Sequence, residues 1–405
     1  MSSASVSTWG SRYNLFYLFF FIIWTPIQRL YLHVDGAGRM IMILSIIAVV
    51  SNISSFISTK KIFNSSAFVC WTLLIVYSMV NSAIKGFSSE YGLLEFYRSN
   101  YLDLYVLLMV SIVEFVRDKY RCLHIVLYAL LLYIVLGTMH LNIEIGERAS
   151  VEELGNALPT RAAACAFFAS VLYREKKLKG DLVVLFSIIA FALFIIIVSG
   201  TRKALGVLGL VLVGLILSNT KKLDFSKVFF ISISFLALYF GLRLIFDSTL
   251  IGERIVTSSD HFDVTLVNNK TINKILMVLL ADRAMQYYIA ISLLYIYPIT
   301  GIGLLNFMEI GQFEYRLHSE YMTQLCENGI IGFSLLVLFY FFMIRGFIIK
   351  RKQGSNVSMY LFGLFAILFL NFTSWSYNMD YIMIIYALFM TEIYSSINKK
   401  APKYQ

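Results

Sequence analysis

GIGLLNFMEIGQFEYRLHSEYMTQLCENGIIG, residues 301–332, is a polar segment punctuated by glycines that leads directly into an apolar run from Phe333 to Ile344. It carries an arginine and a histidine shortly before that run. Runs of this kind cross membranes as helices. Because ionisable groups are costly in lipid, those at the edge of a span are candidates for function. We therefore predict a membrane-spanning helix here, with functional groups at the end of the helix where it meets the membrane surface.

The composition of the chain is that of an integral membrane protein. Of its 405 residues, 59% are hydrophobic and 14% are charged, and the mean hydropathy is +0.75. A span needs about 20 apolar residues, and we count roughly twelve such runs. They lie near 13–32, 40–58, 64–84, 101–116, 122–139, 160–174, 182–200, 204–219, 228–246, 322–344, 357–375 and 380–397. We predict an all-α polytopic protein, with residues 1–405 as a single integral membrane domain.

The net charge of +10 is explained by topology rather than by nucleic-acid binding. If the N-terminus is cytoplasmic and each run crosses once, most of the 34 basic residues fall in the short segments on the inner side. This is the distribution that the positive-inside rule describes. Both termini are then expected in the cytoplasm, and nucleic acid is not expected as a partner.

One outer segment, residues 247–321, is much longer than the others and precedes the tenth run. Within it, residues 284–297 form an apolar and aromatic stretch that ends at Pro298. As a helix this stretch would be about 21 Å long, which is short of the roughly 30 Å hydrocarbon core. We expect a periplasmic loop with an embedded helix near 284–297. A loop of this length usually carries function.

Two arginines border this outer side, where few cations are expected. Arg202 and Lys203 lie between two apolar runs, and Arg283 stands just before the embedded helix. Long basic side chains can snorkel at helix ends, and Arg283 can pair with neighbouring Asp282 at the surface. Alternatively, the planar fork of arginine suits a phosphate, and two arginines suit a pyrophosphate better than one.

His318 is the second candidate for chemistry. A lone histidine is often structural, but a neutral imidazole at the membrane lip can also accept or orient the proton of a hydroxyl. Glu327, at the start of the tenth run, can cap the helix or form a pair. Asp260-His261-Phe262-Asp263 lacks a convincing fourth metal ligand, and no nucleotide-binding motif is present. We expect no metal and no cofactor.

These features resemble the O-antigen ligase/polymerase (WaaL/Wzy) superfamily of the bacterial envelope. The resemblance covers the topology, with about twelve spans and a large periplasmic loop before the tenth. It also covers a local pattern, R…P-x-x-G-x-G…H-[NS]…E-x-G-x-x-G, and the family's arginine that opens a span after a small residue. The matching residues are Arg202, Arg283, Pro298, Gly301, Gly303, His318, Ser319, Glu327, Gly329 and Gly332.

The resemblance implies a metal-independent, inverting glycosyltransferase of GT-C-like helical fold in the bacterial inner membrane. Its donor would be a glycan linked to undecaprenyl pyrophosphate, and a second lipid-linked oligosaccharide would be its acceptor. By this resemblance Arg202 and Arg283 bind the pyrophosphate, and His318 activates or positions the acceptor hydroxyl. The residues expected to contact substrate are Lys203, Gly301, Gly303, Ser319 and Glu327.

Within the superfamily, ligases tend to have His-Asn where this chain has His318-Ser319, which favours an O-antigen polymerase. The alternative is an O-antigen ligase, which transfers the finished polysaccharide to lipid A-core. A flippase or other transporter is a further alternative, but only Glu114 and Glu392 are expected within spans. A chain-length regulator and a flippase are the protein partners that a polymerase would have.

Overall fold

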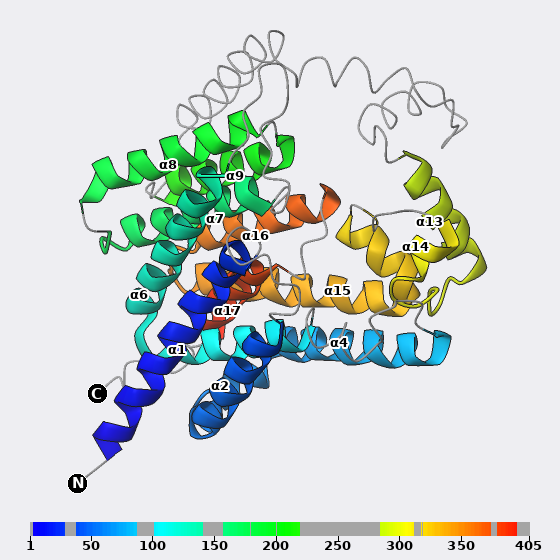
Figure 1. Cartoon of the computed structure of the whole chain (residues 1–405), viewed down its shortest axis with the longest axis horizontal. Coiled ribbons are helices and arrows are strands. Elements are labelled where there is room, and N and C mark those ends of the chain that lie inside the picture. Colours follow the sequence, from blue (N-terminus) through cyan, green and yellow to red (C-terminus); the bar gives the residue numbers. More distant parts are fainter. Residues whose placement is uncertain are drawn as a thin grey trace.

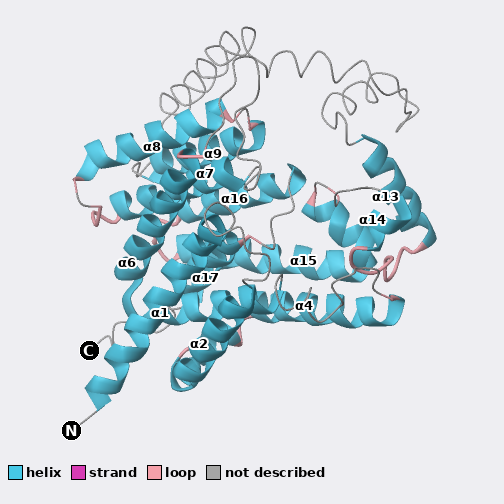
Figure 2. Ribbon diagram, viewed as in Figure 1, coloured by secondary structure: helices cyan, strands magenta, loops and turns pink. Residues whose placement is uncertain are grey.

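The computed structural model describes residues 3–28, 38–86, 101–140, 157–178, 180–199, 201–218, 284–311, 317, 319–373 and 379–394. Within these ranges the regular elements are all helices (Figures 1 and 2). Their bounds are α1 Ser3–Pro26, α2 Gly38–Ser58, α3 Lys60–Phe63, α4 Ser66–Lys85, α6 Asp103–Thr138, α7 Ala157–Arg174, α8 Asp181–Val198, α9 Arg202–Ser218, α13 Ala284–Ile296, α14 Asn306–Gly311, α15 Glu320–Lys352, α16 Ser358–Thr373 and α17 Asp380–Tyr394. The predicted span at 228–246 and the sequence 260–263 lie outside the described residues.

Most of the helices overlap the predicted apolar runs, because lipid forces a chain to pair its backbone groups internally. Among the described residues, α2, α4, α6 and α15 are long and apolar enough to cross a membrane, and α8, α9, α13 and α16 are apolar but shorter. The chain is therefore a helical membrane protein. The total of about twelve crossings stays a prediction.

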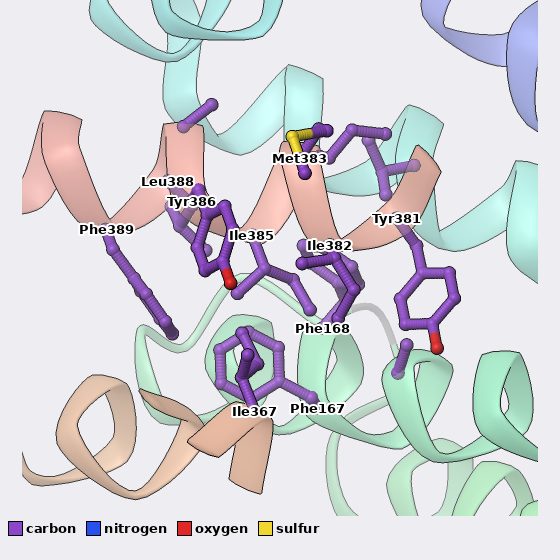
Figure 3. Close-up of a cluster of buried hydrophobic side chains, with 14 of the residues drawn as sticks. Phe167, Phe168, Ile367, Tyr381, Ile382, Met383, Ile385, Tyr386, Leu388 and Phe389 are labelled. Atoms are coloured by element: carbon purple, nitrogen blue, oxygen red, sulfur yellow. The ribbon is translucent and has the colours of Figure 1, made fainter. Parts of the chain in front are cut away.

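Exposed apolar side chains line the outside of the bundle. Ile53 and Ile57 of α2 and Ile84 of α4 expose 58%, 72% and 77% of their surface. Such a surface is unfavourable in water over a large contiguous area, but it suits contact with lipid. The inside of the bundle is built around α17, which is buried on nearly all sides. In Figure 3 its side chains pack against Phe167 and Phe168 of α7 and Ile367 of α16.

The predicted spans at 101–116 and 122–139 are the two parts of α6, which meet at a sharp bend. Asp118 at the bend has non-helical dihedral angles (φ −149°, ψ 87°). Its carboxylate accepts a hydrogen bond of 3.1 Å from the backbone N–H of Arg121. An aspartate in this position caps the start of the following helical part, so one residue is sufficient for the turn.

Both acids that the sequence places within spans have basic partners. Glu392 of α17 accepts hydrogen bonds from Lys119 of α6 (2.8 Å) and Lys350 of α15 (3.0 Å). Glu114 of α6 is buried and pairs with Arg117 at 2.5 Å. The first group joins three helices at one end of the bundle, which we call the cation-rich end. The opposite end, where α7 and α17 begin and α16 ends, is called the mouth.

The tenth predicted span differs from the observed helix. The sequence predicts one span over residues 322–344, but α15 breaks at Gly329 and folds back on itself. The rings of Tyr321 and Phe333 are 6.5 Å apart, whereas residues twelve positions apart in a straight helix are separated by about 18 Å. Residues 320–328 form the first arm of this hairpin, and residues 330–352 form the second arm. A span can therefore start only after Gly329.

Backbone groups freed by the break are paired with residues 298–303, a segment that we call the seam. The N–H groups of Ile302 and Gly303 donate to the carbonyls of Cys326 and Glu327 at 3.0 and 2.9 Å. In the opposite direction, the N–H of Ile330 donates to the carbonyl of Pro298 at 2.9 Å. The seam thus replaces the helical hydrogen bonds that the hairpin gives up, as non-helical backbone within a membrane protein requires.

The seam also explains two of the glycines in the motif. Gly329 has φ +62° and ψ −164°, a region that is essentially restricted to glycine. A Cβ atom at Gly301, which also has positive φ, would lie 2.6 Å from the backbone of Cys326, Glu327 and Gly329. The two halves of the predicted motif, 298–303 and 327–332, therefore lie in backbone contact.

We expect Gly329→Ala to destabilise the protein by roughly 3 kcal/mol or more, because alanine disfavours these dihedral angles and its Cβ would clash with the seam. The matched control is Gly354→Ala, where φ is +83° but nothing lies within 4 Å of the added Cβ. That control should cost only about 1–2 kcal/mol. Thermal unfolding of the detergent-solubilised protein measures both, and equal losses would contradict the role of the seam.

Candidate functional site

The first arm of α15 carries a polar face that is buried inside the protein. The residue that precedes it and five residues within it are at most 2% exposed; they are Ser319, Glu320, Thr323, Gln324, Glu327 and Asn328. Burial of polar groups is costly unless they are hydrogen-bonded. A concentration of such groups within an apolar bundle is therefore a candidate for function.

A ladder of amide hydrogen bonds runs along this face to a carboxylate. Asn328 donates from Nδ2 to Oε1 of Gln324 at 2.9 Å, and Gln324 donates from Nε2 to Oε1 of Glu320 at 3.0 Å. An ionised carboxylate can only accept hydrogen bonds, so it fixes the orientation of both amides. The ladder ends at Glu320, whose side chain is completely buried two residues after His318.

Glu327 lies on the seam side of the arm. Its Oε1 accepts a hydrogen bond of 3.1 Å from the N–H of Leu305, a residue with positive φ. Asn81 of α4 donates from Nδ2 to the carbonyls of Thr300 (2.8 Å) and Glu327 (3.1 Å). Glu327 thereby holds the turn that follows Gly303 against the hairpin. Gly301, Gly303 and Glu327 are brought together by the fold, and their contact with substrate stays a prediction.

Ser319 fixes the start of the first arm. Its hydroxyl accepts from the N–H of Met322 at 3.5 Å as the helix N-cap and lies 3.2 Å from the carbonyl oxygen of Asn371, to which it donates. Asn371 in turn donates to Tyr340 Oη at 2.5 Å, and Tyr340 is hydrogen-bonded to Tyr386 at 2.6 Å. The residue next to His318 is thus tied to α16 and, through the second arm, to α17.

The predicted cations are only partly within the described residues. Arg202 is the first residue of α9, but its side chain, like Arg283 and His318, lies outside them. Lys203 follows it and is half-buried. The start of α9 is close to the mouth, because Val207 of α9 lines one small cavity together with Thr160, Leu370 and Tyr381. The start of α9 and the start of the first arm at Ser319, which is hydrogen-bonded to Asn371 near the end of α16, therefore lie at the same end of the bundle.

Arg161 of α7 is a buried cation at the mouth that the sequence analysis missed. It is 7% exposed and forms an ion pair with Asp380 of α17 at 2.6 Å. Its guanidinium also lies over the ring of Tyr133, with Cζ 4.2 Å from the ring centroid. The signal in the sequence was a charge at the second position of the apolar run 160–174, at the end of the run where few cations are expected.

Among the described residues, no group of three or more His, Cys, Asp and Glu side chains converges as a metal ion would require. The four cysteines are buried, free and separate. The chain matches no protein-family model and no curated protein.

We expect Ser319→Ala to destabilise the protein by about 1 kcal/mol, since it removes a helix N-cap. Ser319→Asn should retain most of the stability, because asparagine is an equally good N-cap. The control is Ser358→Ala, because Ser358 is the first residue of α16 rather than its N-cap. Thermal unfolding in detergent tests this, and a Ser319→Ala midpoint equal to that of Ser358→Ala would show that the cap contributes nothing.

Proposed function

We propose that the protein is a polysaccharide polymerase that joins lipid-linked oligosaccharide repeat units at the periplasmic face of a bacterial inner membrane. The observation that carries this proposal is the convergence of helix starts at the mouth. Arg202 opens α9 there, and Ser319, next to His318, is tied to the end of α16. Cations and a proton acceptor at one end of an apolar bundle suit a substrate with a lipid tail and an anionic leaving group.

The proposed reaction is a single displacement at the anomeric carbon of the donor sugar. The bond from this carbon to the pyrophosphate oxygen breaks, and undecaprenyl pyrophosphate leaves with the electron pair. The acceptor hydroxyl oxygen forms the new glycosidic bond from the opposite face, which inverts the configuration. His318 takes the hydroxyl proton, while Arg202 and Arg283 stabilise the charge that develops on the leaving group. Lys203 adds a further positive charge beside Arg202.

Ser319 stands where ligases of the superfamily tend to have asparagine. We take its hydrogen-bonded position as support for the polymerase over the ligase. Its hydroxyl has the length to cap the first arm and to reach the carbonyl of Asn371 at the same time. The lipid-linked donor supplies the energy of transfer, so neither a nucleotide nor a cofactor enters the proposed reaction. A flippase that delivers repeat units and a regulator of chain length are the proposed partners.

Arg202→Ala and Arg283→Ala are each expected to abolish or severely reduce polymer formation. Removing one charge-assisted hydrogen bond costs about 1.5–3 kcal/mol, which corresponds to roughly tenfold to more than a hundredfold in rate if the contact exists only in the transition state. Lysine should substitute poorly, because it lacks the planar fork. Polymer immunoblots of cells with equal protein levels measure the effect. The control is the exposed Arg345→Ala in the second arm, and full activity of either test variant would remove that arginine from the site.

His318→Ala should stop transfer by about 10²–10⁴-fold while leaving donor binding nearly intact, because general-base assistance acts on the acceptor. In a host that makes lipopolysaccharide, cells with this variant should show lipid A-core that bears a single repeat unit. His124→Ala is the control, since that ring binds the carbonyl of Tyr120 within α6.

One gel of extracted lipopolysaccharide reads the outcome of the His318 experiment. A normal ladder from His318→Ala would exclude a catalytic role for this residue. Core without any repeat unit in a deletion strain would replace the polymerase proposal with the ligase.

A further inference from the structure

In the ion pair between Arg161 and Asp380, one nitrogen of the guanidinium and one oxygen of the carboxylate form no hydrogen bond among the described residues. Arg161 donates from Nη2 to Asp380 Oδ1 at 2.6 Å and from Nη1 to Tyr133 Oη at 3.1 Å. Asp380 Oδ1 also accepts from the N–H of Tyr381 at 2.8 Å. Arg161 Nε and Asp380 Oδ2 are both buried, and neither has a hydrogen-bond partner in the part of the chain that the structure describes.

Unpaired polar atoms at this depth are costly. The two residues are 7% and 5% exposed, and each unsatisfied group is expected to destabilise the fold. A pair that served only to join α7 and α17 could be replaced by apolar side chains without loss of stability. The retained polarity therefore points to a ligand.

The charges of the pair restrict the chemistry of that ligand. A bound anion would be repelled by Asp380, and a bound cation would be repelled by Arg161. What remains is a neutral group that accepts from an N–H and donates to a carboxylate oxygen. A hydroxyl group does both with one oxygen atom.

Aromatic rings and a small, mostly apolar cavity lie beside the pair. Arg161 lies against the aromatic rings of Tyr133 and Tyr381, with Cζ 4.2 and 5.5 Å from their centroids. Tyr381, visible at one end of α17 in Figure 3, and Thr160 also line the small cavity beside the pair. Arg161 lies near the start of α7 and Asp380 is the first residue of α17, so the pair lies at the mouth.

We propose that Arg161 and Asp380 form a subsite that binds a hydroxyl group of the acceptor glycan. Arg161 donates from Nε to the hydroxyl oxygen, and the hydroxyl donates to Asp380 Oδ2. This subsite rests on the proposed polymerase function, since it lies at the same end of the bundle as the starts of α9 and of the first arm. It assigns acceptor recognition to α7 and α17, which are separate in sequence from the proposed catalytic residues.

The test is the double variant Arg161→Met/Asp380→Leu of the full-length protein, which removes both charges together. Calorimetric titration in detergent uses two probes, the repeat-unit oligosaccharide released from the host's own polysaccharide and inorganic pyrophosphate. We expect oligosaccharide affinity to fall about tenfold to a hundredfold and pyrophosphate affinity to change less than about twofold. Arg161→Gln/Asp380→Asn, which keeps a donor and an acceptor without charge, should retain oligosaccharide binding within about threefold of the wild type.

Lys350→Met/Glu392→Leu, an ion pair at the cation-rich end, is the matched control and should bind both probes normally. Unchanged oligosaccharide affinity in Arg161→Met/Asp380→Leu would overturn the subsite. The ion pair would then only join α7 and α17. Loss of pyrophosphate affinity instead would make it an anion site and also overturn the proposal. If the apolar variant does not fold, the Arg161→Gln/Asp380→Asn variant is the test. We expect this variant to retain oligosaccharide binding, and loss of binding would overturn the proposed subsite. Oligosaccharide binding by a wild-type protein that makes no polymer would refute the polymerase and leave the subsite standing.

Discussion

A backbone amide or carbonyl within a membrane protein must find its partner inside the protein, and α15 meets this constraint in an unusual way. Where the helix folds back at Gly329, its open hydrogen bonds are taken up by the seam at residues 298–303. Each unpaired group in lipid would cost several kcal/mol. The hairpin, the seam and α4, through Asn81, are therefore fixed as one unit.

This arrangement distinguishes the protein from carriers in which a broken helix binds ions. In such carriers the free carbonyls of the break coordinate the ion. Here the carbonyls of Cys326 and Glu327 already accept hydrogen bonds from the seam. The break instead reverses the direction of the chain and buries a polar helical face. Its consequence is geometric, because the start of the first arm, with Ser319 and Glu320, is buried inside the bundle.

The helices could be predicted from the sequence because a long run of apolar residues in lipid must pair its own backbone groups, which a helix does. The fold-back could not, because a glycine at which the chain reverses looks the same in the sequence as a glycine within a helix. Its hydrogen-bond partners lie at 298–303, outside the pattern. Arg161 was missed for a similar reason, since its partner Asp380 is 219 residues away and only the fold places the two together. Local patterns predicted the elements, and long-range pairing determined the candidate site.

The order of the seam and the hairpin along the chain matters for biogenesis. The seam precedes Gly329 by only about 30 residues, so it has already been synthesised when the break emerges, and closing so short a loop costs little entropy. Asn81 of α4 is synthesised much earlier. It donates its hydrogen bonds to Thr300 and Glu327 once the seam and the hairpin are both present. Because the second arm supplies the apolar length, the first arm need never be exposed to lipid as a span of its own. Membrane insertion of this region is thus expected to proceed as one hairpin event, in which a polar helix enters the bundle already paired.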